Sequence, residues 1–274
     1  MTQKYVCLDN KFYTEDQPIF KLNRAMKFGD GVFETAKIVS GKVKYLGEHL
    51  ARMKRGLTAL EIQCSKGDIE VLKVCIEQLL IKNEIERGGI LRIIAQRAGL
   101  GRYAPEKNQV FFYLETENTK ENGYQLNRKG MNIGTSKKIR LQFSEFMMHK
   151  TLNAIPYILA SKEKTESKFD ELLLLNEDGN VVEGTASNIF IIKNGTISTP
   201  NIAEGCLAGV MRKVIIDKIQ ALGTTVDETT LTIQDIESAD ELFFTNATQG
   251  IRWASAYGNK RYFRKLSTNL IESL

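Results

Sequence analysis

The chain has 274 residues, 42% hydrophobic and 26% charged, which is enough to bury one large core or two modest ones. No apolar run approaches the roughly 20 residues of a membrane helix, and the first ten residues lack a signal-peptide pattern. The formal net charge is +5, but Lys and Arg are interleaved with Asp and Glu along the chain. We therefore expect a cytoplasmic protein that binds neither nucleic acid nor membrane, with a mildly basic surface suited to small anionic ligands.

Cysteine and histidine are scarce in this sequence. Four cysteines occur without a CxxC pair or another metal-ligand spacing: Cys7, Cys64, Cys75 and Cys206. The two histidines are His49 and His149. We expect reduced thiols without a catalytic role and no metal site, so the chemistry falls to Lys, Glu, Tyr, Arg or a cofactor.

Short runs of strand-forming residues dominate the first part of the chain. The expected strands span residues 5–8, 11–14, 32–39, 42–45, 89–97 and 109–115. Between the fourth and fifth strands, apolar residues recur every three or four positions, which predicts two amphipathic helices. The first helix covers residues 46–61, and the second follows Asp68, which we expect to be its N-cap. These elements predict an α+β unit.

Residues 116–123 are polar, rich in turn formers and without periodicity, as is typical of a linker. We place the boundary there, which gives a smaller domain over residues 1–117 and a larger one over 118–274. The larger domain is expected to contain helices and strands in alternation. The helices span 152–167 and 208–222, and the strands span 125–139, 171–175, 181–183, 188–192, 241–245 and 252–257.

Taken singly, the polar residues of this chain predict little. Lys150 follows a loop at an expected helix start, and Arg52 is one of several charges on its helix, so both are ordinarily solvated. Glu183 ends an expected strand before a glycine. The Gly-flanked helix start around Gly209 and Met211 suits a phosphate, because free backbone amides and the helix dipole converge there.

The order of five segments is more specific. They are FGDGVFETAKIVSGKVKYLGEHLARM, HKTLN, VVEGTASNIF, GCLAGVMR and LFFTNATQG. In sequence and spacing they resemble the class IV aminotransferase family, the fold type IV pyridoxal phosphate enzymes, over Phe28 to Ile251. The resemblance implies a mixed α/β, two-domain protein with the cofactor in the interdomain cleft. It also implies a β-barrel-like core in the larger domain and a homodimer.

The resemblance further implies a role for each matched residue. Lys150 is expected to carry pyridoxal 5′-phosphate as a Schiff base and to move a proton at the substrate carbon. Glu183 is expected to keep the pyridine nitrogen protonated. The cofactor's phosphate is expected to bind one arginine, a helix start and a turn: Arg52, Gly209, Val210, Met211 and Thr248.

Two segments indicate the subgroup within the family. Lys150-Thr151-Leu152-Asn153 looks like the lyases and the D-amino acid enzymes, because branched-chain enzymes usually have Gly-Gly-Asn-Tyr after the lysine. Residues 92–109 are similar to the RGxGGRGY segment of the lyases, although they depart from it at Ala98. Arg97 and Arg102 occupy its arginine positions and are our candidates for binding the carboxylates of the substrate.

We therefore expect a 4-amino-4-deoxychorismate lyase, which makes 4-aminobenzoate and pyruvate from a small anionic amine. The alternative is a branched-chain or D-amino acid aminotransferase that uses the same lysine and glutamate. A third possibility is a binding protein without catalysis. The presence of Lys150, Glu183 and Arg52 argues against it, because loss of one of them would be expected in a non-enzyme.

Overall fold

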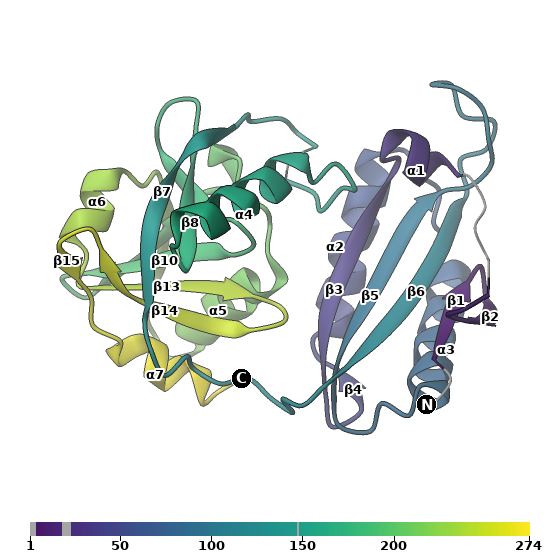
Figure 1. Cartoon of the computed structure of the whole chain (residues 1–274), viewed down its shortest axis with the longest axis horizontal. Helices are drawn as coiled ribbons and strands as arrows, with labels where there is room; N and C mark the ends of the chain where they lie inside the picture. Colours follow the sequence, from purple (N-terminus) through teal and green to yellow (C-terminus); the bar gives the residue numbers. More distant parts are fainter. Residues whose placement is uncertain (1–3, 18–22, 147) are drawn as a thin grey trace. The chain divides into compact units, whose positions relative to one another are not determined.

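The computed structural model describes residues 4–17, 23–146 and 148–274. The chain divides into two compact units (Figure 1). Unit 1 comprises Met1–Gly123 and His149–Asn153, and unit 2 comprises Tyr124–Met148 and Ala154–Leu274. The first crossing thus falls at the end of the segment expected to be a linker, rather than after residue 117. The return of the segment that contains Lys150 to unit 1 was not foreseen from the sequence.

Unit 1 is a six-stranded antiparallel sheet in the order β2-β1-β6-β5-β3-β4. Its strands are β1 (Tyr5–Leu8), β2 (Lys11–Thr14), β3 (Gly31–Val39), β4 (Lys42–Val43), β5 (Gly88–Arg97) and β6 (Val110–Thr119). Its helices are α1 (Arg24–Phe28), α2 (Leu46–Ala59) and α3 (Lys66–Lys82). Helices α2 and α3 cover one face of the sheet (Figure 1). The apolar stripe predicted on each helix lies in this core.

Helix α3 begins one turn before the expected position. Ser65 is its N-cap, and its hydroxyl accepts from the Asp68 amide at 3.1 Å. The Asp68 carboxylate accepts in turn from the Ser65 amide at 2.7 Å. The prediction that Asp68 is the N-cap is therefore wrong, since Asp68 supplies the returning half of a capping box.

The segment with Lys150 extends the sheet of unit 1. The Phe33 amide donates to the Lys150 carbonyl at 2.9 Å, and the Leu152 amide donates to the Gly31 carbonyl at 3.0 Å. Strand β4 pairs only with the far end of β3, at Ile38 and Val39, which leaves this edge available. Residues 149–153 therefore run beside the start of β3, with an isolated antiparallel bridge from Val32 to Thr151.

Unit 2 is a nine-stranded mixed sheet in the order β12-β11-β10-β13-β14-β7-β8-β9, with β15 paired to β14. Its strands are β7 (Met131–Leu141), β8 (Glu171–Asn176), β9 (Val181–Gly184), β10 (Asn188–Lys193), β11 (Thr196–Pro200), β12 (Val226–Thr229), β13 (Glu241–Asn246), β14 (Gly250–Tyr257) and β15 (Lys260–Arg261). Its helices are α4 (Ile155–Ser167), the 3-10 turn η1 (Ile202–Glu204), α5 (Val210–Ala221), α6 (Ile233–Ser238) and α7 (Lys265–Ile271).

The two edges of this sheet approach each other. Val181 on β9 donates its amide to the carbonyl of Leu231, just beyond β12, at 2.7 Å. The sheet thus curls back on itself in the manner of a partly closed barrel.

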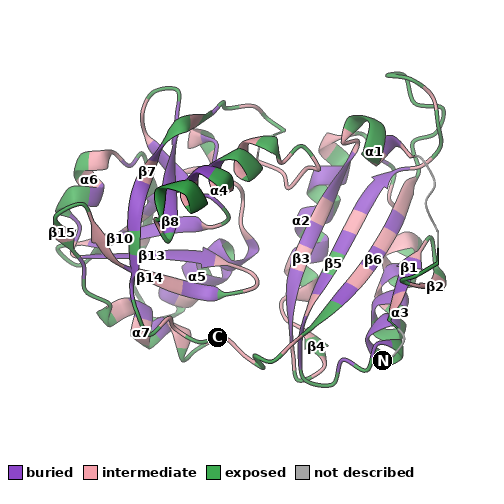
Figure 2. Cartoon of the chain, in the orientation of Figure 1, coloured by how far each residue is buried: buried purple, intermediate pink, exposed green. Residues whose placement is uncertain are grey.

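Burial explains the sequence character of the central strands. Strand β8 is buried at every position, and β10 and β13 at all but the last (Figure 2). Because both faces of these strands are covered, they read as continuous apolar runs rather than alternating ones. Among the helices in the described part of the chain, none is long and apolar enough to cross a membrane.

One expected strand is shorter than predicted. Strand β7 begins at Met131 rather than at residue 125. The Asn127 side chain accepts from the Trp253 amide at 2.9 Å and donates to the Trp253 carbonyl at 3.0 Å, so it replaces strand pairing at this point. The sequence pattern cannot distinguish such a side-chain substitute from a strand.

Helix α3 offers a matched test of this packing. Leu79 is fully buried in the core of unit 1, whereas Ile81, two residues later, is 77% exposed. We expect Leu79→Ala to lower the free energy of unfolding by about 2–5 kcal/mol through lost burial and a cavity. Ile81→Ala should change it by less than about 0.5 kcal/mol. Urea unfolding measures both, and equal effects would contradict the assigned face of α3.

Candidate functional site

Lys150 is fixed through its backbone at the edge of β3. Its ammonium group lies over the Phe33 ring, 4.2 Å from the centroid, which is a favourable cation–π distance. The helix expected from residue 152 begins instead at Ile155, so Lys150 lies in an extended segment rather than on a first helical turn. A sheet edge holds the lysine backbone more rigidly than a loop would.

Arg52 lies in a buried cluster of charged and polar side chains. Its Nε donates to Glu34 Oε1 at 2.8 Å and its Nη2 to Glu34 Oε2 at 2.5 Å. His49 Nδ1 lies 2.7 Å from the same Oε2. All three side chains are at most 5% exposed. The default interpretation of Arg52 as one charge on an exposed helix face is therefore wrong.

The charge balance of this cluster depends on Glu34. Burial raises the pKa of the Glu34 carboxyl, but the Arg52 charge and the hydrogen bonds from Arg52 and His49 outweigh burial and lower the pKa below 4.5. The ionised carboxylate therefore holds two nitrogens of the Arg52 guanidinium in one plane. Any ligand contact of Arg52 is made from this fixed orientation.

In unit 2, Glu183 is held by three donors. Tyr157 Oη donates to Oε1 at 2.7 Å, and Asn188 Nδ2 and the Leu207 amide donate to Oε2 at 3.3 and 3.1 Å. The carboxylate is almost fully buried. Burial and the nearby Glu183 charge raise the pKa of Tyr157 well above 10, so the phenol stays protonated and donates.

Asn188 connects Glu183 to the start of helix α5. Its amide nitrogen also donates to the Leu207 carbonyl at 2.8 Å, and its carbonyl oxygen faces Gly209. A Cβ added to Gly209 would lie 1.9 Å from Asn188 Oδ1, so only glycine fits. Gly209 is the N-cap of α5 and supplies no capping side chain to the amides that follow.

The remaining predicted residues of unit 2 lie in this helix and in one turn. Val210 and Met211 form the buried first turn of α5. Thr248 lies in the turn between β13 and β14, where its amide and hydroxyl both donate to Asn246 Oδ1, at 3.2 and 3.1 Å. Its hydroxyl is thereby oriented by the turn.

These groups of unit 2 suit pyridoxal phosphate. Glu183 offers a buried carboxylate for a protonated ring nitrogen, and the uncapped start of α5 offers backbone amides for a phosphate. The Thr245 hydroxyl is buried and has no hydrogen-bond partner among the described residues, and Thr245 pairs with Asn188 across the sheet. The cofactor's polar atoms would satisfy donors and acceptors that the fold leaves open.

The two arginines expected to bind substrate, Arg97 and Arg102, differ in the partners of their guanidinium groups. Arg97 donates to Asp30, to the carbonyls of Leu60 and Glu61, and to Asn108, which engages all three of its nitrogens. This geometry argues against Arg97 as a partner for a substrate carboxylate. Arg102 is exposed, and its guanidinium has no hydrogen bond or ion pair to any residue that the structure describes.

Sequence reasoning missed residues that orient the predicted ones. Tyr157 and Asn188 hold Glu183, and the Asn188 position could have been suspected from the Glu-Gly-x-x-x-Asn spacing. Glu171 fixes the turn after Glu183, because its Oε1 accepts from the Thr185 amide and hydroxyl at 3.0 and 2.6 Å. No sequence signal distinguished Glu171 from a surface carboxylate.

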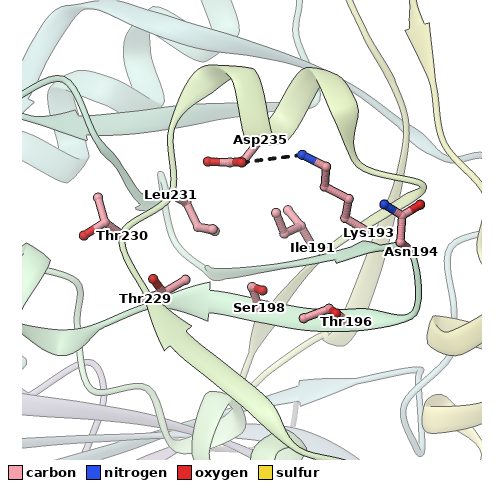
Figure 3. Close-up of a pocket in the computed structure, with 9 residues that line it drawn as sticks. All are labelled: Ile191, Lys193, Asn194, Thr196, Ser198, Thr229, Thr230, Leu231 and Asp235. Atoms are coloured by element: carbon pink, nitrogen blue, oxygen red, sulfur yellow. Dashed lines mark ion pairs between the residues drawn. The ribbon is translucent and has the colours of Figure 1, made fainter.

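A separate hollow of about 430 Å³ opens on unit 2 between β10, β11 and the segment that leads from β12 to α6 (Figure 3). Ile191 and Leu231 lie among hydroxyl side chains there, and Lys193 pairs with Asp235 at 3.8 Å. None of the predicted site residues lines this hollow. It is therefore distinct from the groups around Glu183.

The Glu34 cluster yields a pH prediction. Because the pKa of Glu34 is lowered in the folded protein, its ionised form stabilises the fold above about pH 4.5, and this contribution disappears as the pH falls through the folded value. We expect Glu34→Gln to be less stable by about 3–5 kcal/mol at pH 7, with a difference that shrinks in acid. Urea unfolding from pH 7 to pH 3 measures this, with Glu15→Gln in the exposed Lys4–Glu15 pair as control. A pH-independent difference would contradict the assignment.

Comparison with known proteins identifies the family of this chain. The sequence profile described as amino-transferase class IV matches residues 31–257. A putative branched-chain-amino-acid aminotransferase of Methanocaldococcus jannaschii is 31% identical over 252 residues, covering 90% of this chain and 85% of that protein. An aminodeoxychorismate lyase of Vibrio harveyi is 26% identical, covering 84% of this chain and 83% of that one.

Among solved structures, a branched-chain aminotransferase of Thermoproteus uzoniensis shares the fold with a TM-score of 0.88. It is 23% identical, and the alignment covers 99% of this chain and 93% of that one. The family profile spans most of the chain, including Lys150, Glu183 and the start of α5. The chain therefore belongs to the amino-transferase class IV family and is a pyridoxal phosphate-dependent enzyme.

Proposed function

We propose that this enzyme is a 4-amino-4-deoxychorismate lyase, which converts its substrate to 4-aminobenzoate and pyruvate. The observation that carries the proposal is the Lys150-Thr151-Leu152-Asn153 segment and the way it docks. Asn153 Nδ2 donates to the Gly29 carbonyl at 3.4 Å, and a Cβ on Gly29 would lie 2.7 Å from Asn153 Oδ1. Asn153 is thus matched to Gly29, and the Leu-Asn sequence after the lysine supports the lyase-like subgroup over the branched-chain one.

In this proposal Lys150 Nζ would hold the cofactor and, once the substrate amine has replaced it, would take the proton from the ring carbon that bears the substrate's nitrogen. Bound pyridoxal phosphate supplies an electron sink for that carbon. Glu183 keeps the pyridine nitrogen protonated, and Tyr157 and Asn188 hold Glu183 in place for this role. The Lys150 side chain is partly buried, and its Nζ lies over the Phe33 ring, which limits the directions in which Nζ can point.

Other residues of the chain would bind the two anionic groups. The amides of Val210 and Met211, the Thr248 hydroxyl and the Arg52 charge would hold the cofactor's phosphate. Arg102, exposed and without a partner among the described residues, would bind a substrate carboxylate. We also propose a homodimer, on the family resemblance alone.

The second candidate is an aminotransferase, supported by the relative of Methanocaldococcus jannaschii that is 31% identical. It would use Lys150 and Glu183 in the same roles but return the amine to a 2-oxo acid. The two activities differ in their products, since only the lyase releases pyruvate from 4-amino-4-deoxychorismate.

One assay separates these candidates and tests the lysine. We expect the purified enzyme to show a visible absorption band from bound cofactor and to release pyruvate with 4-aminobenzoate. Lys150→Ala should lose the band and reduce turnover by at least about 1,000-fold, because the attachment point and the base are removed together. Amino transfer from L- or D-amino acids without pyruvate release would reject the lyase. A band that persists in Lys150→Ala would reject the assigned lysine.

Gly209 allows a test of the proposed phosphate site. Gly209→Ala places a methyl group against Asn188 Oδ1, so Asn188 must move, and Glu183 and the start of α5 move with it. We expect the dissociation constant for pyridoxal phosphate to rise at least about tenfold, equivalent to about 1.4 kcal/mol. Gly47→Ala is the matched control, because a Cβ there meets nothing within 4 Å. Unchanged cofactor affinity in Gly209→Ala would place the phosphate elsewhere.

A further inference from the structure

Tyr157 connects helix α4 to Glu183. It lies in the first turn of α4, which begins at Ile155. Its neighbours Ile155 and Ile158 are 63% and 60% exposed. The Tyr157 ring instead packs against an apolar cluster formed by Leu141, Ala160, Leu174, Val182 and Cys206. This packing directs the phenol inward, where Oη donates to Glu183 Oε1 at 2.7 Å.

The bond from Tyr157 is the shortest of three hydrogen bonds that Glu183 accepts from uncharged donors. Asn188 Nδ2 and the Leu207 amide donate to Oε2 at 3.3 and 3.1 Å. A hydrogen bond from a neutral donor to a carboxylate stabilises the ionised form, and the short bonds of this kind are the strong ones. Of these three donors, Tyr157 therefore does most to keep the buried Glu183 carboxylate ionised.

Hydrogen bonds to Glu183 also affect a base that shares a proton with it. A carboxylate and a pyridine nitrogen in contact share one proton, which stays on the nitrogen when the carboxylate is stabilised in its ionised form. A donor to the carboxylate thus favours the protonated ring. Pyridoxal phosphate accepts electrons from a substrate carbon best when its ring nitrogen carries a proton.

We propose that Tyr157 is a positioning residue that acts through Glu183: its hydrogen bond keeps the carboxylate ionised, so that the proton of the cofactor's pyridine ring stays on the nitrogen. The inference rests on the role proposed for Glu183, but it holds for a lyase and for an aminotransferase alike. Loss of the phenol hydroxyl weakens the electron sink and leaves Lys150 and the residues proposed for the phosphate in place.

The other titratable groups of unit 2 around Glu183 define the pH range for a test. Burial, and then the charge of Glu183, raises the pKa of Tyr157 well above 10 and that of Cys206 to about 12. Both groups therefore stay protonated between about pH 6 and pH 9. The charged side chains on the neighbouring elements are held in two ion pairs, Arg212–Glu228 at 2.7 Å and Lys164–Glu171 at 3.8 Å.

The test follows the protonation of the ring nitrogen directly. Wild-type and Tyr157→Phe holoenzymes are loaded with pyridoxal phosphate that carries ¹⁵N in its ring, because the NMR chemical shift of this nitrogen differs between its protonated and unprotonated forms. We expect the pH midpoint of its titration to be lower in Tyr157→Phe by about one unit or more, the effect of removing a hydrogen bond to a charged group. A contact that merely tied α4 to β9 would not move this midpoint.

Tyr262 provides the matched control in unit 2. It is 6% exposed, and its Oη donates to the Ile236 carbonyl at 2.8 Å. Tyr262→Phe therefore removes the hydroxyl of another buried tyrosine without touching Glu183, and we expect the wild-type midpoint in this variant.

Two further measurements support the comparison. In Tyr157→Phe we expect kcat to fall about tenfold while KM for the amine substrate stays within about twofold of wild type. Replacement of Tyr157 by a ring-fluorinated tyrosine keeps the hydroxyl and makes it a stronger donor, so the midpoint of the ring nitrogen should rise. The fluorinated protein gives the answer if Tyr157→Phe does not fold or does not bind the cofactor.

The possible outcomes distinguish this inference from the role proposed for Glu183. A ring nitrogen that is protonated in the wild type at neutral pH and titrates identically in Tyr157→Phe would overturn the inference and leave the role of Glu183 intact. An equal decrease of the midpoint in Tyr262→Phe would also overturn it, because the effect would then reflect general loosening of unit 2. An unprotonated ring in the wild type at neutral pH would reject the role of Glu183 and the inference with it.

Discussion

The pairing between Lys150–Leu152 and Gly31–Phe33 is the constraint on which the arrangement of unit 1 depends. It places Lys150, the proposed catalytic lysine, on a sheet edge, where two backbone hydrogen bonds and the Phe33 ring determine its direction. The same short stretch of β3 leads into Glu34, which orients Arg52. A displacement of this strand would therefore move the lysine and the arginine together.

Carboxylates with little exposure orient Arg52, Arg97 and the turn after Glu183. Glu34 holds Arg52, Asp30 holds Arg97, and Glu171 holds the turn that follows Glu183. Each carboxylate is paired or accepts several hydrogen bonds, which offsets the cost of removing it from water. In unit 2 the neutral Asn188 has the corresponding role, since it joins Glu183 to the Gly209 turn. Polar contacts inside each unit thus fix the orientation of these side chains.

The sequence predicted those elements whose formation depends on residues near one another in the chain. Strands β1 and β2 have the expected bounds, and helices α2 and α3 present the expected apolar faces, because periodicity and turn residues suffice for these features. The return of residues 149–153 to unit 1 could not be predicted, since it depends on an edge of β3 more than a hundred positions earlier.

The same limit applies to the candidate site. Lys150, Glu183 and Gly209 were found through ordered motifs, but the partners that define their environment lie elsewhere in the chain. Arg97 was expected to face substrate, yet its carboxylate partner Asp30 is 67 positions away and no pattern connects the two. Tyr157 is likewise 26 positions from Glu183. The sequence identified residues whose chemical type suits the reaction. The tertiary contacts then showed that Arg97 is engaged by Asp30 and is not available to a substrate carboxylate.

The choice between the two reactions depends on how the substrate is held rather than on the lysine. In both proposed reactions Lys150 would move a proton at the carbon bearing nitrogen, so the lysine cannot distinguish them. The lyase substrate carries one carboxylate directly on its ring, at a fixed distance from the ring amine, so a cation that binds this carboxylate must lie at a matching distance from the group that takes the proton. Arg102 and Lys150 both belong to unit 1, and the Arg102 carbonyl accepts from Arg24 Nη1 at 2.6 Å. An amino acid carries its carboxylate on the carbon that bears the amine, so the two proposed reactions need their cation at different distances from Lys150.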